Sequence, residues 1–212
     1  FFINKSGIAI SNERYDKAFR FTDGLAKVQS NKKWFYINKN EIPISDERYS
    51  FVDNFCEGLA AVQKGQEFFF IDKSGNPISD ERYYSVSSFY EGLAAVKKNH
   101  SSPVFFVNKN GKQAFNETYD VADNFSEGLA MVKKDGGYFF IDKTGSPVSD
   151  KKYHDAKNFS DGLALISKKG KFFVIDKNGH QISNKGYDVI HNFSDGLALV
   201  IDNSKYFFID KA

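Results

Sequence analysis

The stretch Phe55-Cys56-Glu57-Gly58-Leu59-Ala60-Ala61-Val62, followed after five residues by Phe68-Phe69-Phe70-Ile71-Asp72-Lys73-Ser74-Gly75, decides the fold of this 212-residue chain. It contains two runs of aromatic, β-branched and small apolar residues, separated by turn-forming Gly, Asp and Ser. Such runs are typical of short β-strands, and a short polar connection between them predicts an antiparallel hairpin. The same pattern occurs along the whole chain.

The tripeptide Gly-Leu-Ala recurs six times, at intervals of 34, 34, 36, 34 and 34 residues. Its glycines are Gly24, Gly58, Gly92, Gly128, Gly162 and Gly196. An acidic residue precedes each of these glycines, and a phenylalanine lies three positions before each one. A second block of the form Phe-Phe-Ile-Asp-Lys occurs seven times, from Phe1 to Lys211. Residues 1–212 are therefore predicted to form one continuous array of six full periods plus one extra strand block.

A period of 34 residues also occurs in arrays of paired helices, but no 11-residue window of this chain sustains a helical apolar period. We therefore predict an all-β fold. The run Phe68–Ile71 is apolar on both faces, and a single repeat is too small to cover both. We expect short antiparallel hairpins that stack on their neighbours in an open, twisted array. The alternative is a closed six-unit ring resembling a propeller.

Finer features of one repeat are also predicted. Asp72–Gly75 suits a type I turn whose glycine has positive φ. Asn76–Ser79 is predicted to return as a third short strand, and Tyr83–Phe89 to form an irregular connector or a single helical turn. Glu41 stands where other repeats have that turn glycine. Because a non-glycine residue at positive φ is strained, this turn is predicted to relax to another form.

Charge and composition exclude two classes of partner. The chain carries 29 Lys and Arg against 27 Asp and Glu, a formal net charge of +2. This balance gives no broad basic field, so binding of nucleic acid is not expected. No apolar run approaches the roughly 20 residues of a membrane helix, so membrane insertion is not expected either. The chain begins at Phe1 without a visible signal peptide, and we expect it to be a piece of a longer protein.

No group of residues predicts catalysis, a metal site or a cofactor. The four histidines form no i, i+4 pair, and the single Cys56 stands where three other repeats have Ser. Phosphate loops, nucleophile elbows and zinc-ligand spacings do not occur in the sequence. The recurring acids could form a cation ladder, but one carboxylate per repeat is too few for calcium. Each acid is instead predicted to accept a backbone hydrogen bond at a turn, and the protein is predicted not to be an enzyme.

The repeat as a whole resembles the WG repeat family of bacterial proteins. The resemblance rests on the pattern Phe-x-Asp/Glu-Gly-Leu-Ala-x-Val, an aromatic pair, Ile-Asp-Lys-x-Gly and a recurring tyrosine, and it covers essentially the whole chain. The sequence departs from the family at the Trp-Gly pair, because only Trp34 remains and Phe replaces each Gly. The resemblance implies an all-β repeat array, a bacterial origin and a binding or interaction role, with no shared catalytic residues.

The position of that Trp supplies the candidate binding residues. Trp34, Tyr138 and Tyr206 occupy it in three repeats, and Trp and Tyr stack on sugars and anchor peptide partners. One hypothesis is an exposed aromatic strip; the alternative is a ladder of rings that serves only the core. We expect a non-catalytic scaffold whose partner is another protein. The alternative partner is a cell-envelope glycan bound through these aromatic side chains.

Overall fold

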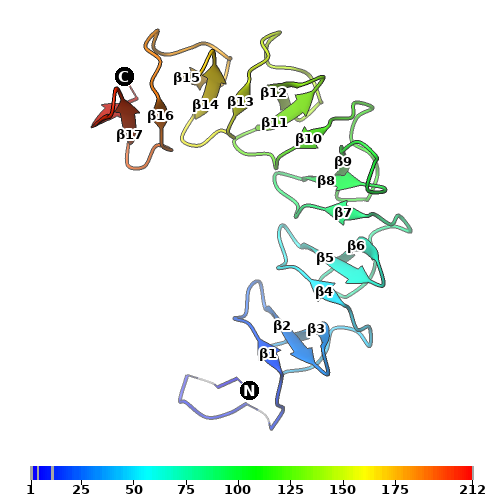
Figure 1. The fold of residues 1–212 in the computed structure, drawn as a ribbon. Coiled ribbons are helices and arrows are strands. Elements are labelled where there is room, and N and C mark those ends of the chain that lie inside the picture. The colour runs from blue at the N-terminus through cyan, green and yellow to red at the C-terminus, as the bar shows by residue number, and fades with distance from the viewer. Residues whose placement is uncertain (1, 4, 11, 212) are drawn as a thin grey trace. The chain divides into compact units, whose positions relative to one another are not determined.

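The computed structural model describes residues 2–3, 5–10 and 12–211, and it consists there of short β-strands joined by tight turns (Figure 1). Within these residues, eighteen strands form six antiparallel sheets of three strands each. The predicted all-β class and the repeated hairpins are confirmed. No helix occurs in the described residues, so they contain none that could cross a membrane.

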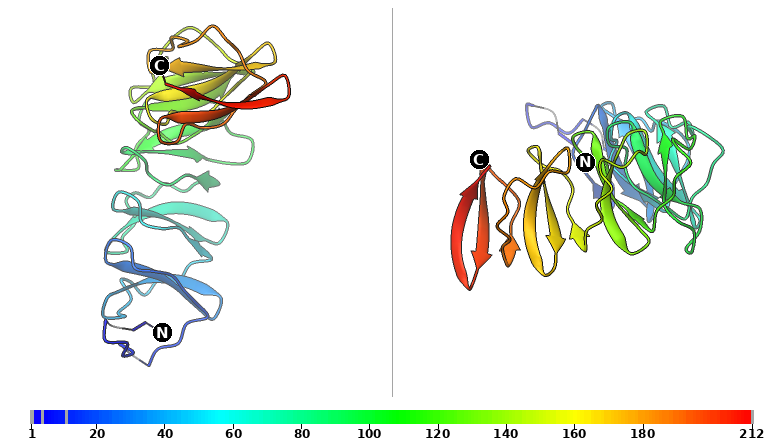
Figure 2. Two further views of the ribbon diagram at one scale, coloured as in Figure 1. Left: turned by 90° about the vertical axis from the view of Figure 1, so that its left-hand side faces the viewer. Right: turned by 90° about the horizontal axis from the view of Figure 1, so that it is seen from above.

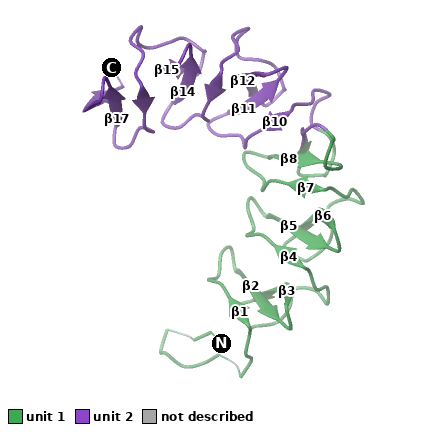
Figure 3. Ribbon diagram, viewed as in Figure 1, with its two compact units in different colours: residues 1–102, 107–113 green, residues 103–106, 114–212 purple. Residues whose placement is uncertain are grey.

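The chain, predicted to be one continuous array, groups into two compact units (Figure 3). Unit 1 comprises residues 1–102 and 107–113, and unit 2 comprises residues 103–106 and 114–212. The strands of unit 1 are β1 (Lys17–Ala18), β2 (Leu25–Ser30), β3 (Lys33–Asn38), β4 (Phe51–Val52), β5 (Leu59–Lys64), β6 (Glu67–Asp72), β7 (Ser85–Val86) and β8 (Leu93–Lys97). Strand β9 (Phe105–Asn108) has residues in both units. The strands of unit 2 are β10 (Val121–Ala122), β11 (Leu129–Lys134), β12 (Gly137–Asp142), β13 (Asp155–Ala156), β14 (Leu163–Lys168), β15 (Lys171–Asp176), β16 (Val189–Ile190), β17 (Leu197–Asp202) and β18 (Lys205–Asp210).

Every sheet is built in the same way. A two-residue strand pairs with the first strand of the hairpin that follows it, as β4 pairs with β5, and β5 then pairs with β6 over six residues. The predicted third strand at Asn76–Ser79 is wrong, because this segment contributes only the single bridge Ile71↔Pro77. The third strand comes instead from β7, inside the segment predicted to be a connector or a helical turn.

The segment Tyr83–Phe89 is extended because its backbone is shared between two repeats. The N–H of Tyr83 donates to the carbonyl of Phe68 at 2.9 Å, and Phe68 returns a bond at 2.8 Å. Two residues further on, β7 pairs with β8 of the next hairpin. Tyr83, Val86 and Phe89 are spaced by three residues, as in a helical turn. A helical turn would leave the ladder partners unpaired, so this spacing does not reflect a helix.

The hydrophobic core lies between successive sheets of each unit, which follow one another in chain order (Figure 2). In unit 1, one cluster joins Leu25 and Tyr36 of the first sheet to Val62 and Phe69 of the second. Unit 2 repeats this arrangement. The middle sheet of unit 2, β13-β14-β15, therefore buries one face against the sheet before it and the other against the sheet after it, as the apolar strands predict.

In several repeats, one aromatic ring packs against a Phe and a Tyr of the following repeat. The ring centre of Phe70 lies 4.7 Å from that of Phe89 and 6.2 Å from that of Tyr83. The same arrangement joins Phe140 to Phe159 at 4.8 Å. Such tilted pairs contribute about 0.5–1.5 kcal/mol beyond the burial of their area. These contacts are the recurring element of the interface between repeats.

The Asp-Lys-x-Gly turn has the predicted geometry. The N–H of Gly75 donates to the carbonyl of Asp72 at 3.0 Å, and Gly75 has a φ of 84°. The Asp72 carboxylate accepts from the N–H groups of Ser74 and Asn76. This side chain therefore holds the turn from inside, as aspartate does at such positions.

The predicted relaxation of the turn at Glu41 is wrong. Glu41 keeps positive φ, at 56°, and its N–H donates to the carbonyl of Asn38 at 2.9 Å, as in the glycine-containing turns. The side chain of Asn38 holds the turn by accepting from Asn40 and Ile42. The Glu41 carboxylate is buried and accepts from the hydroxyl of Tyr15 at 3.4 Å. These contacts offset the roughly 1 kcal/mol of strain that a side chain carries at this φ.

The turn glycines also let neighbouring repeats approach closely. A Cβ at Gly75 would lie 2.9 Å from the Cβ of Ser45 in the preceding repeat. A Cβ at Gly145 would lie 2.6 Å from the ring of Phe115. The glycine is therefore needed both for its positive φ and for the space that the preceding repeat fills.

We predict that Gly145→Ala lowers the free energy of unfolding by about 2 kcal/mol or more, because a clash adds to about 1 kcal/mol of backbone strain. Gly136→Ala is the matched control, since Gly136 has a φ of 77° but nothing within 4 Å of its added Cβ. The free energy of unfolding of this control should fall only by the backbone strain of about 1 kcal/mol. Denaturant unfolding measures both values, and equal losses would show that contact between repeats does not explain this glycine.

Candidate functional site

The three predicted binding residues occupy the same place in their sheets, the second position of the second hairpin strand. Trp34 lies in β3, where its backbone pairs with Tyr49. Its half-buried ring lies 5.9 Å from that of Phe19 and packs against the second sheet. Trp34 thus contributes to the core between two repeats.

Tyr138 and Tyr206 differ in their surroundings. Tyr138 is half-buried, packs on the core of unit 2, and has the Lys133 ammonium 4.8 Å from its ring centre. Tyr206 is 70 % exposed. At equivalent positions, Phe68 and Phe172 are half-buried and Val104 is buried. This placement makes Trp34 and Tyr138 parts of the packing between sheets, and a binding role for the three residues stays a prediction.

A pocket that recurs from repeat to repeat is a second candidate site, and the sequence did not predict it. We call these cavities the edge pockets; each is lined by the recurring tyrosine, by the first Phe of the next Phe-Phe block and by a proline. Three of them are lined by Tyr15, Phe35 and Pro43, by Tyr49, Phe69 and Pro77, and by Tyr119, Phe139 and Pro147. Their volumes are about 450, 310 and 350 Å³.

Charged side chains form the rim of the edge pockets. In the second pocket, Lys64 and Glu47 form an ion pair at 2.6 Å. The guanidinium of Arg82 lies 4.3 Å from the ring centre of Phe69. The same arginine donates to the carbonyl oxygens of Ser79 and Glu81, which fixes its plane over the ring. The apolar floor and the charged rim are thus held in place by the repeat itself.

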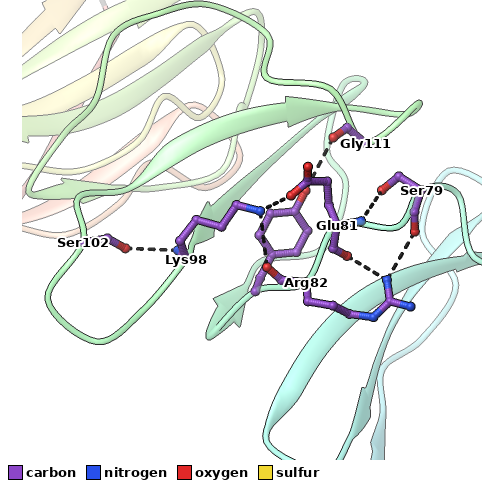
Figure 4. Close-up of polar contacts among 7 residues, drawn as sticks. Ser79, Glu81, Arg82, Lys98, Ser102 and Gly111 are labelled. Carbon is purple, nitrogen blue, oxygen red and sulfur yellow. Dashed lines mark hydrogen bonds and ion pairs between the residues drawn. The ribbon is translucent and has the colours of Figure 1, made fainter.

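Figure 4 shows the corresponding residues one repeat further along. Lys98 forms an ion pair with Glu81, and its ammonium lies 4.8 Å from the ring centre of Tyr83. The Tyr83 hydroxyl donates to the carbonyl of Gly111 at 3.5 Å. Burial raises the pKa of Tyr83 to about 12. The buried tyrosine therefore stays protonated at neutral pH and acts as a hydrogen-bond donor.

The rim ion pair is kept with its charges reversed in the last repeat. Glu47 and Lys64 are separated by 17 residues, and so are Lys185 and Asp202, which lie 3.7 Å apart. Asp202 also accepts from Lys171 at 3.2 Å. The attraction is therefore kept in the last repeat, while the sign of the charge at each of the two positions is reversed. An exposed pair of this kind stabilises the fold by about 0–1 kcal/mol, so its main effect is on the local surface charge.

The recurring acids before Gly-Leu-Ala lie in two-residue turns. Glu57 has a φ of 53° and Gly58 a φ of 88°, and Cys56 and Leu59 exchange backbone hydrogen bonds across them. Positive φ at both central residues is typical of a type I′ turn, which favours Gly at the second position. A glutamate at the first position is strained, so its side chain needs a compensating contact.

That contact is with the next repeat. The Glu57 carboxylate accepts from the N–H groups of Glu91 at 2.5 Å and Gly92 at 2.9 Å, and it pairs with Lys109 at 3.1 Å. Glu127 makes the same contacts with Gly162 and Lys177. The predicted backbone hydrogen bond is therefore present, and its donor belongs to the neighbouring turn. We call this contact the turn clamp.

The turn clamps favour the ionised carboxylate. Burial opposes ionisation of Glu57, but the hydrogen bonds from Lys109, Gly92 and Glu91 outweigh it, and the pKa of the carboxyl lies below its usual value. The pKa of Glu127 is lowered by the equivalent contacts. Among residues 2–3, 5–10 and 12–211, no group of three His, Cys, Asp or Glu side chains could hold a metal ion.

We predict that Glu57→Gln lowers the free energy of unfolding at neutral pH by about 1 kcal/mol, because it removes a charged acceptor of several hydrogen bonds. The lowered folded-state pKa means that this stabilisation is complete above about pH 5 and is lost as the pH falls through the folded pKa. The difference between wild type and variant should therefore vanish in acid. Denaturant unfolding across the pH range measures it, with Glu67→Gln as the exposed control; a difference independent of pH would contradict the clamp.

Comparison with known families gives the identity of the repeat. The model described as WG containing repeat matches residues 1–34, 34–67, 68–99, 105–138, 138–172 and 172–206. The chain belongs to the WG repeat family. Its matched segments repeat with the period set by the Gly-Leu-Ala turns, and residues 34–67 contain nearly all of β3 together with β4 and β5. Each matched segment after the first therefore joins the second hairpin strand of one sheet to the first two strands of the next. No curated protein matches the sequence.

Solved structures similar to this WG repeat array are β-propellers. A structure described as the eukaryotic initiation factor has a TM-score of 0.55 at 16% identity, covering 86% of this chain and 58% of its own. KlHsv2 with its loop 6CD replaced by a Gly-Ser linker has a TM-score of 0.50 at 11% identity, and the match covers 84% of this chain and 72% of KlHsv2. Hsv2 of Kluyveromyces marxianus has a TM-score of 0.48 at 14% identity, and the match covers 88% of this chain and 72% of that Hsv2. At these identities, the first two show a likeness of fold alone.

One signal in the sequence could have located the edge pockets. The pattern Ser-Asp-Glu-Arg-Tyr occurs as Ser45–Tyr49 and again as Ser79–Tyr83. An acidic and a basic residue directly before a buried tyrosine indicate a charged rim beside an apolar floor. The cavity itself depends on how closely neighbouring repeats pack, which the sequence pattern does not specify.

Proposed function

We propose that this WG repeat array is a non-catalytic module that binds a protein partner along its edge pockets. The observation that carries the proposal is the recurrence of one pocket design, with an aromatic and proline floor and a charged rim, at the period of the repeat. Tyrosine and arginine are enriched in the energetically important centres of protein interfaces. Two such pockets in adjacent repeats of unit 1 suit a partner that makes several small contacts at once.

The dimensions of the pockets indicate what each one binds. Volumes of about 310 to 450 Å³ suit one large apolar side chain of the partner, together with part of its backbone. Since the rim carries both signs of charge, the partner segment would carry charged residues on either side of its apolar anchor. The rim charges then set the specificity and the rate of association more than the affinity.

We test this function with a variant that keeps the fold and reverses the rim. Glu47→Lys combined with Lys64→Glu swaps an ion pair into the orientation that Lys185 and Asp202 already have. Peptides selected from a displayed random library on the wild-type chain should lose about tenfold or more in affinity for this variant. Lys112→Glu, in unit 1 but outside the edge pockets, is the control and should leave affinity unchanged.

A glycan array run in parallel tests the alternative partner. The glycan alternative draws support from Tyr206, whose ring is 70 % exposed. Failure to select any peptide, together with glycan binding that Trp34→Ala or Tyr206→Ala abolishes, would contradict a protein partner and favour the glycan. Selected peptides that bind the rim-reversed variant unchanged would show that the edge pockets are not the binding site.

We also propose that the six sheets form an open array rather than a closed ring. Each sheet has three strands, fewer than the four of a usual propeller blade. The chain also carries an aromatic block at both ends. Phe2 packs on Tyr15 and Phe21, as Phe140 packs on Tyr153 and Phe159. In a closed ring, Phe208 would need the place that Phe2 occupies.

Small-angle scattering of the dilute monomer tests the open array. A closed, compact body of this length should have a radius of gyration of about 17 Å. We predict a clearly larger value, because an open array of stacked sheets does not fold back on itself. A value at the compact limit would contradict the open array and favour the ring.

A further inference from the structure

Two arginines of unit 1 are held flat on an aromatic ring beside the edge pockets. The guanidinium of Arg48 lies 4.0 Å from the ring centre of Phe35, and that of Arg82 lies 4.3 Å from the ring centre of Phe69. Arg48 lines the first edge pocket and Arg82 lines the second. Each arginine directly precedes the recurring tyrosine of its repeat. The same stacked side chain thus recurs in two successive repeats.

The backbone fixes the orientation of each guanidinium. Nη1 of Arg48 donates to the carbonyl oxygens of Ser45 at 3.2 Å and Glu47 at 3.0 Å. Nη1 of Arg82 makes the same two bonds one repeat further along, at 3.3 and 2.9 Å (Figure 4). Because the ring and these bonds already hold the side chain, the guanidinium loses little conformational entropy when it binds a ligand.

The opposite edge of each guanidinium, formed by Nε and Nη2, is available to a ligand. Within residues 2–3, 5–10 and 12–211, this edge of Arg48 and of Arg82 donates to no protein acceptor, and neither arginine forms an ion pair. Arg48 is exposed and Arg82 is half-buried. Two parallel N–H groups match the two oxygens of a carboxylate, and such a bidentate contact is strong and directional. Each arginine therefore offers a carboxylate site beside an apolar floor.

The repeats of unit 2 have no such arginine. Thr118, Lys152 and Gly186 occupy the position before the tyrosine. The ammonium of Lys152 lies 5.8 Å from the ring centre of Phe139 and pairs with Asp135 at 3.5 Å. A lysine also lacks the planar fork that binds both oxygens of a carboxylate. This pair of carboxylate sites is therefore a property of unit 1.

We propose that the edge pockets of unit 1 bind a peptide segment with two carboxylate side chains, which the Nε and Nη2 groups of Arg48 and Arg82 hold. This inference rests on the proposed function and names the chemistry that the partner supplies. An apolar side chain next to each carboxylate enters the pocket. A carboxylate fits better than a phosphate, because Glu47 and Glu67 line the second pocket and repel a dianion more strongly.

The spacing of the repeats sets the spacing of the two carboxylates. The two pockets are contiguous, since Arg48 lines the first and its neighbours Glu47 and Tyr49 line the second. Stacked sheets lie about 10 Å apart. In a polyproline II segment, residues i and i+3 lie on the same face about 9 Å apart, and aromatic-lined grooves bind this conformation. We therefore expect the two acidic residues of the partner three positions apart.

Peptides selected from a displayed random library on the full chain test the proposal. We expect Asp or Glu beside a large apolar residue, with a second acid three positions away. Arg48→Lys and Arg82→Lys should each lower the affinity by about five- to tenfold although they keep the charge, because lysine lacks the fork. Arg20→Lys, in unit 1 but outside the edge pockets, is the matched control and should leave the affinity unchanged.

A double-variant cycle separates recognition of the acids from a general loss of stability. Replacing either acid of a selected peptide by its amide should lower the affinity by about tenfold. For each arginine, the peptide that lacks the matching acid should bind the wild type and the lysine variant equally well. A generally weakened pocket would instead lose affinity for every peptide to the same extent.

A titration with a defined probe does not depend on the selection. Acetyl-Phe-Glu-amide at millimolar concentration should shift the Nε–H resonances of Arg48 and Arg82 in the ¹⁵N-labelled full chain. Acetyl-Phe-Gln-amide should not shift them, because a neutral amide does not form the charged bidentate contact. The resonance of Arg20 should respond to neither probe.

Three outcomes would overturn the inference and leave the proposed function standing. One is a set of peptides that lose affinity for the rim-reversed variant but show no preference for acids. A second is unchanged affinity of the selected peptides for both lysine variants. The third is a titration in which the glutamate probe shifts neither arginine. Failure to select any peptide would instead contradict the proposed function, and the inference with it.

Discussion

The packing of one aromatic ring against a Phe and a Tyr of the next repeat is the interaction on which the structure depends. Phe70 makes this contact in unit 1, and Phe106 and Phe140 make it in unit 2. A three-stranded sheet with a two-residue edge strand has too little area to form a core alone. Since both faces of each hairpin are apolar, the sheet is stable only between its neighbours. Stability of the array is therefore a sum of interfaces between nearest neighbours rather than of separate domains.

The strained turns at the rim of the array follow from the same constraint. Glu57 and Glu127 accept positive φ because their carboxylates reach the backbone and a lysine of the following repeat. The turn glycines, such as Gly145, leave space for the preceding repeat. Strain that one repeat carries is thus offset by a contact with another. The edge pockets arise where two repeats meet, so one pocket design occurs in several repeats.

The sequence predicted the features that lie within one repeat. The period, the all-β class, the hairpin of Leu59–Val62 with Phe68–Ile71 and the Asp-Lys-x-Gly turn all depend on local residue types, and all are confirmed. The sequence did not predict the features whose conformation depends on a neighbouring repeat. The extended Ser85–Val86 strand, the unrelaxed turn at Glu41 and the edge pockets depend on contacts that a single repeat does not contain. The binding role of Trp34, Tyr138 and Tyr206 stays a prediction, because position in the repeat did not reveal that two of these rings are half-buried.

Native-state hydrogen exchange of the full chain carrying Phe140→Ala tests most directly whether repeats share their stability. Phe140 belongs to β12, but its ring packs on Phe159 of the following repeat. Truncation of such a ring costs about 3–5 kcal/mol. Shared stability predicts that amides of β14 and β15 lose protection together with those of β11 and β12. Loss confined to β11 and β12, with β14 and β15 unchanged, would contradict it.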